Sequence, residues 1–141
     1  MVPLVAAALG FIGRDFASRY PYALPVREAR AAHYPSLWRL LEPLAYESPP
    51  GPVTRGALTT LRNDLRAWYY GPGGLVLSRD TQKHYVAIHA AIAAIPDGSP
   101  DDALDDVDLH PIQSAASRLR TALCRDIGGR DPARAVRRRA Y

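Results

Sequence analysis

Apolar side chains recur every three or four residues in four stretches of the chain, a spacing typical of helices with one buried face. The stretches are 26–46, 54–70, 78–95 and 108–127. Thr54 and Ser78 stand where N-caps are expected, and Pro111 suits the first turn of a helix that starts at Asp108 or His110. Only residues 75–77 have the character of a strand. The sequence therefore predicts an all-α fold, a four- to five-helix bundle.

Proline and glycine mark the breaks between these helices. Pro35 and Pro43 are expected to kink the first helix or to restart it. Loops are predicted over 47–52 and over the aspartate-rich stretch 97–108. The Gly-Pro-Gly-Gly run at 71–74 predicts a turn between two helices. The connection of about seven residues at 71–77 is too long for a DNA-binding helix-turn-helix.

The chain begins with an uncharged apolar run, residues 2–13. Twelve residues are too few to cross a bilayer, which takes about 20. The run also lacks the basic start and the small-residue cleavage site of a secretory signal. Three interpretations stay open: a core helix, a short membrane-dipping anchor, or the remainder of a longer anchor that starts upstream of Met1. The predicted organisation is an N-terminal segment (1–24), a helical domain (25–129) and a tail (130–141).

Charge is distributed unevenly along the chain. Residues 1–128 hold 13 basic and 13 acidic side chains, so the whole formal excess of +4 lies in the last residues. We predict a disordered basic tail, either a solvated end or a segment that contacts anionic lipid or nucleic-acid phosphates. The contacting residues would be Arg130, Arg134, Arg137, Arg138 and Arg139.

The cysteine and histidines exclude several chemistries. Cys124 is the only cysteine, which rules out an internal disulfide and a thiolate zinc site. His84 and His89 are five residues apart and point to different faces of a helix, so they do not form a metal-binding pair. The spacing of the aspartates at 97–108 lacks the EF-hand pattern. We therefore expect no metal and no cofactor.

A catalytic role is the weakest interpretation of the polar residues. Asp80 and His84 are one helical turn apart and form a surface pair in the simplest interpretation. The enzyme alternative requires a pocket that joins Trp68 or Tyr70 to this pair. We predict that the protein is not an enzyme.

One aromatic and glycine-rich stretch is a candidate partner or ligand surface. It comprises Trp68, Tyr69, Tyr70, Gly73 and Gly74. Packing within the core and the turn is the alternative role for the same residues.

Two blocks of sequence carry a resemblance to a group of proteins. Residues 61–70 with 73–74 and 77–78, and residues 117–123 with 126–128, resemble uncharacterised small helical proteins of actinobacteria. The resemblance implies an N-terminal membrane anchor followed by a polar helical domain, and it implies no activity.

These observations predict a non-enzymatic helical interaction module at or near the membrane surface, in the cytoplasm. The expected partners are an anionic membrane surface or another protein. The alternatives are a nucleic-acid-associated protein that uses the arginine tail, and a soluble domain that binds a ligand or partner.

Overall fold

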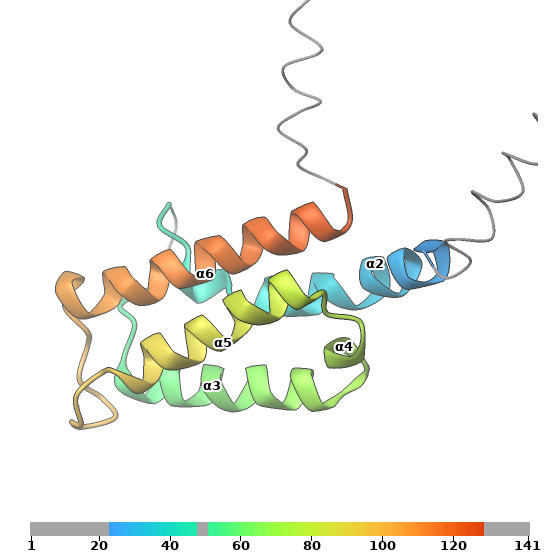
Figure 1. Cartoon of the computed structure of the whole chain (residues 1–141). Coiled ribbons are helices and arrows are strands. Elements are labelled where there is room, and N and C mark those ends of the chain that lie inside the picture. Colours follow the sequence, from blue (N-terminus) through green and yellow to red (C-terminus); the bar gives the residue numbers. More distant parts are fainter. Residues whose placement is uncertain (1–22, 48–50, 129–141) are drawn as a thin grey trace, which may run out of the picture.

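The computed structural model describes residues 23–47 and 51–128, and the periodic stretches fold there as helices (Figure 1). Over those two ranges the chain forms five α-helices and one 3₁₀ turn, and no strand. The elements are α2 (Ala23–Leu40), η1 (Glu42–Leu44), α3 (Arg55–Tyr70), α4 (Pro72–Leu75), α5 (Arg79–Ala93) and α6 (Asp106–Asp126). The predicted all-α fold is confirmed. The apolar run 2–13 and the tail 130–141 lie outside the described residues.

The two predicted caps begin α3 and α5. The hydroxyls of Thr54 and Ser78 accept hydrogen bonds, of 3.2 and 3.1 Å, from the backbone N–H three residues further on. Each bond satisfies one of the free donors of a helix start. The strand suggested for 75–77 is wrong, because Leu75 ends the single turn of α4 and the chain then leads into the Ser78 cap.

The last helix begins earlier than the prediction from Pro111. It starts at Asp106 rather than at Asp108 or His110, because the Asp105 carboxylate accepts a hydrogen bond of 2.8 Å from the backbone N–H of Asp108. Pro111 therefore lies beyond the first turn of α6, inside a continuous helix. The carboxylate cap at the positive end of the helix dipole therefore determines where α6 starts, and the proline does not.

The first described helix also differs from the prediction. α2 runs from Ala23 to Leu40 without a break at Pro35, which lies on its exposed side. The proline removes one backbone donor, but the carbonyl left free there can bond water. Pro43 falls in η1, after α2 has ended. The predicted boundary between residues 24 and 25 falls within α2.

The apolar faces of the helices meet in one core. In Figure 1, α5 lies between α6 and α3, and α2 packs against both α3 and α6. α5 packs more extensively on α6 than on α3, and α6 contributes the small buried residues Ala116 and Ala122. The largest fully buried side chains are Leu37, Leu41, Leu44, Leu65, Ile88, Ile112, Leu119 and Leu123.

A polar cluster joins three helices inside this apolar packing. One carboxylate oxygen of Asp126 accepts hydrogen bonds from the hydroxyls of Tyr34 and Thr81, both 2.8 Å long. Thr81 is completely buried, and its hydroxyl also accepts from Ser78 at 3.1 Å. Burial and the bond to Asp126 raise the pKa of Tyr34, so its hydroxyl stays a donor. The cluster fixes α2 and α5 against the end of α6.

Candidate functional site

The predicted aromatic and glycine surface divides into an inward and an outward half. Trp68 points inward, and its indole N–H donates to the Ser36 hydroxyl at 2.9 Å and to the His33 carbonyl at 3.3 Å. Gly73 is buried against the Trp68 ring, and a Cβ at this position would overlap the ring. These two residues fasten α4 to the body.

The outward half consists of Tyr69, Tyr70 and Leu75, which we call the aromatic shoulder. Tyr70 is 80% exposed and Leu75 90% exposed, although both are large apolar side chains. A shallow pocket of about 460 Å³ lies between α3 and α4 at this place. Gly74 lies directly on the backbone carbonyl of Tyr69, with no space for a Cβ. Gly74 therefore supports the shoulder, and it is also one of the residues that line this pocket.

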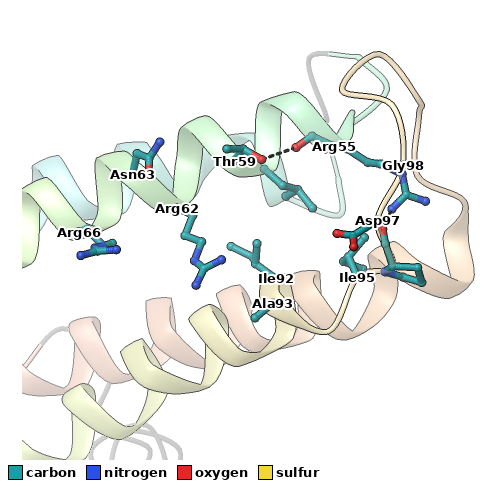
Figure 2. Close-up of a pocket in the computed structure, with 12 residues that line it drawn as sticks. Arg55, Thr59, Arg62, Asn63, Arg66, Ile92, Ala93, Ile95, Asp97 and Gly98 are labelled. Carbon is teal, nitrogen blue, oxygen red and sulfur yellow. Dashed lines mark hydrogen bonds between the residues drawn. The ribbon is translucent and has the colours of Figure 1, made fainter.

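A groove between α3 and α5 continues from the shoulder, and we call it the α3–α5 groove. Its larger part has a volume of about 400 Å³. A smaller part of about 290 Å³ is lined by Tyr69, Tyr70 and Tyr85 and so connects the groove to the shoulder. Figure 2 shows the larger part, with polar side chains of α3 on one wall and the end of α5 on the other. The larger part is lined by Arg55, Leu58, Thr59, Arg62, Asn63, Arg66, Ile92, Ala93, Ile95, Pro96, Asp97 and Gly98.

Three arginines follow the α3 wall of the groove. Arg55, Arg62 and Arg66 are separated by seven and four residues, which places them on one side of the helix. Figure 2 shows Arg62 extending from α3 toward the side chain of Ile92 on α5, with Arg66 further along the same side of α3. Leu58 and Ile92 are buried core residues that reach the groove from below. The groove thus combines a basic wall with an apolar floor.

The three arginines differ in their partners. Arg55 hydrogen-bonds the Pro96 carbonyl and lies 3.9 Å from the Asp102 carboxylate, so it holds the loop after α5 in place. Within residues 23–47 and 51–128, Arg62 and Arg66 make neither a salt bridge nor a side-chain hydrogen bond. Two guanidinium groups are therefore available to an anionic partner.

His89 is a groove residue that the sequence analysis did not select. Its ring centre lies 4.7 Å from that of Tyr85, and its buried Nε2 atom has no hydrogen-bond partner among the residues that the structure describes. Burial lowers the pKa of His89, and the charges of Arg62 and Arg66 lower it further. Both effects favour the neutral form of the imidazole. Helical spacing alone could not identify His89 as a candidate site residue, because Arg62 and Arg66, which lower its pKa, come from another helix.

Tyrosines surround the connection between groove and shoulder. The rings of Tyr69 and Tyr85 are stacked with centres 4.8 Å apart, and Tyr70 meets Tyr69 edge-on at 5.5 Å. Burial, together with these neighbours, raises the pKa of Tyr85 to about 12. The Gln82 amide donates to the Tyr69 hydroxyl at 2.9 Å. This part of the wall is held rigidly from both helices.

The other candidate residues do not meet in a site. Asp80 lies 3.4 Å from Arg125 of α6, and no hydrogen bond joins Asp80 to His84. Neither residue lines the groove or the shoulder, where Tyr70 lies. Within the described ranges, no three side chains of the His, Cys, Asp and Glu types are grouped as metal ligands would be.

Cys124 lies in a different and apolar depression, between α2 and α6. This pocket has a volume of about 310 Å³, and Trp38 and Leu123 are among its lining residues. The half-buried thiol is beside the apolar stripe of α6. The five tail arginines proposed for anionic surfaces lie outside the described residues.

Comparison of the chain with protein-family models, curated proteins and solved structures found no match. The resemblance to actinobacterial helical proteins stays a prediction. Among the helices that the structure describes, none combines the length and apolarity that a membrane crossing requires.

Proposed function

We propose that the chain is a non-enzymatic interaction module, which binds another protein through the α3–α5 groove and the aromatic shoulder at or near a membrane surface. One observation carries the proposal. Two arginines without an ionic partner in the described ranges line a mainly polar groove, and this groove leads to the exposed Tyr70 and Leu75. The membrane location rests on residues 2–13 and 130–141 of the sequence.

The composition of this surface supports a protein partner. The centres of protein interfaces are enriched in tyrosine and arginine, and a few such residues supply most of the binding energy. Tyr70 and Leu75 leave large apolar side chains in water, and burying such a side chain contributes about 1.5–3 kcal/mol. A partner that covers the shoulder gains this energy without reorganising the helices.

Nucleic acid is a weaker candidate for the same surface. The described residues hold eleven basic and twelve acidic side chains, so they create no broad positive field. Two arginines neutralise few phosphates, whereas nucleic-acid binding rests on many such contacts. The nucleic-acid alternative therefore depends on the tail.

Site-specific photocrosslinking in the native host tests the proposal. The full chain carries p-benzoylphenylalanine in place of Tyr70 or, as a control, in place of Val107 of α6, which is 79% exposed. We expect a discrete protein adduct from position 70 only, which the charge reversals Arg62→Glu and Arg66→Glu abolish. The exposed Arg79 and Arg118, reversed in the same way, are the matched control and should leave the adduct intact. Identical adducts from both positions, or an adduct that a nuclease removes, would contradict the proposal.

A further inference from the structure

We propose that the segment held in the α3–α5 groove is an acidic amphipathic helix of the partner protein. The inference rests on the proposed function, because it specifies what the same surface binds. It starts from the positions of Arg62 and Arg66 and from the shape of the groove.

The two arginines define the charge pattern of the partner. Arg62 and Arg66 are one helical turn apart, which corresponds to about 6 Å along α3. Two carboxylates one turn apart on a second helix repeat the same spacing. Arginine and carboxylate form short, directional hydrogen bonds that are stronger than bonds between neutral groups. A helix with an i, i+4 pair of Asp or Glu therefore matches the wall.

The floor of the groove defines the apolar side of the partner. Leu58 and Ile92 lie between the two helices, with Ile95 at one end and the exposed Val86 toward the other. A groove between two helices accepts the apolar face of a third, through side chains at i, i+3, i+4 and i+7. The described residues hold no strand whose edge could pair with an extended peptide. Helix-in-groove binding is therefore the mode that this surface supports.

His89 lies where the acidic side of such a helix would approach. Burial and the charges of Arg62 and Arg66 lower the pKa of its imidazole, and its Nε2 atom has no hydrogen-bond partner within residues 23–47 and 51–128. Carboxylates on the two arginines would offset their positive field. The pKa of His89 would then rise on binding, which makes His89 a reporter for the charge of the partner.

The positive charge of the groove favours an acidic partner helix over two other occupants, the tail of the same chain and a second copy of the chain. The tail of the same chain holds five arginines and would be repelled by Arg62 and Arg66. In a symmetric dimer through this groove, the arginine wall of one copy would lie near the arginine wall of the other. A separate acidic segment avoids both conflicts.

Peptide selection tests the inference with the full chain as bait. A phage library of random 16-residue peptides is selected in parallel on the wild type, on the Arg62→Glu/Arg66→Glu variant and on the Arg79→Glu/Arg118→Glu control. We expect the wild type and the control to enrich peptides with apolar residues at i, i+3 and i+7 and two acids one turn apart. The groove variant should enrich Lys or Arg at the acidic positions instead.

Affinity and NMR measurements on one selected peptide complete the test. Reversing both arginines should weaken its binding at least 10-fold, and exchanging its two acids for Lys should restore binding to the variant. The His89 imidazole pKa should rise in the complex. Peptides without acidic enrichment, equal affinity for wild type and groove variant, or no enrichment at all would overturn the inference. If one of these results is obtained while position 70 still gives a protein adduct in the photocrosslinking experiment, only the inference fails and the proposed function stands. If position 70 gives no protein adduct, the proposed function itself is refuted.

Discussion

The buried hydroxyl of Thr81 offers a direct test of what joins α2, α5 and α6. Thr81→Val keeps the shape of the side chain but removes the hydroxyl that donates to Asp126 at 2.8 Å. A hydrogen bond to a charged group contributes about 1.5–3 kcal/mol, and Asp126 keeps its bond from Tyr34 in the variant. We therefore expect the free energy of unfolding to fall by about 1.5–2 kcal/mol, near the lower end of that range.

Urea unfolding followed by circular dichroism at 222 nm measures the change. Thr121→Val is the matched control, because the Thr121 hydroxyl donates at 3.0 Å to the Ser117 carbonyl of its own helix. The control should lose less than about 0.5 kcal/mol, since such bonds within one helix stabilise it little. Equal losses for the two variants would refute the assignment of the cluster as the connection between helices.

A double-mutant cycle tests whether the two donors act on one acceptor. Tyr34 and Thr81 both donate to the same oxygen of Asp126. Tyr34→Phe combined with Thr81→Val should therefore deviate from additivity by at least about 0.5 kcal/mol. Strict additivity would mean that the two hydroxyls stabilise the fold independently.

Three further predictions follow from the structure. The pKa of His89 is lowered in the folded chain, so the unfolded chain takes up the proton first as the pH falls. The free energy of unfolding should therefore decrease as the pH drops below about 6.5. Urea unfolding at pH 5–8 measures this slope, and His89→Gln should flatten it. Gly74→Ala places a Cβ on the Tyr69 carbonyl and should reduce the unfolding free energy by about 2–3 kcal/mol. Deleting residues 1–13 and 130–141 should abolish sedimentation with anionic vesicles while the circular dichroism of the helices persists.

Each of these changes has its own control. His84→Gln, on the same helix as His89, should leave the slope of stability against pH steeper than His89→Gln does. A Cβ on Gly71 meets the Trp68 carbonyl at 3.3 Å, so Gly71→Ala should cost less than Gly74→Ala. Vesicle binding that survives removal of both chain ends would assign membrane attachment to the helical body instead.

Local signals explain why the sequence predicted the helices. Thr54 and Ser78 mark their starts through bonds to the next turn, and stripes such as Leu58 and Leu65 need only one helix to be recognised. The start of α6 was misplaced because two candidate signals compete within a few residues there. Asp105 caps the helix, and Pro111 is tolerated inside it.

The site depends on information that spacing along one helix does not contain. Trp68 and Tyr70 are two residues apart, yet one is fastened inside and the other is 80% exposed. Their opposite roles follow from α4, which folds back over Trp68 through Gly73. The cluster around Asp126 joins residues 45 and 92 positions apart in the chain, so no local pattern could indicate it.

The position of the groove follows from how α5 divides its packing. Its apolar residues, such as Ile88, are buried against α6 and the core, while α3 touches α5 less extensively. The side chains along that looser contact need not be apolar, and Arg62 and Arg66 occupy it without an ionic partner within 23–47 and 51–128. A third helix placed there would give both arginines a carboxylate and cover the floor. Because α5 packs mainly on α6, the side of α5 that faces α3 is less tightly packed, and the groove lies there.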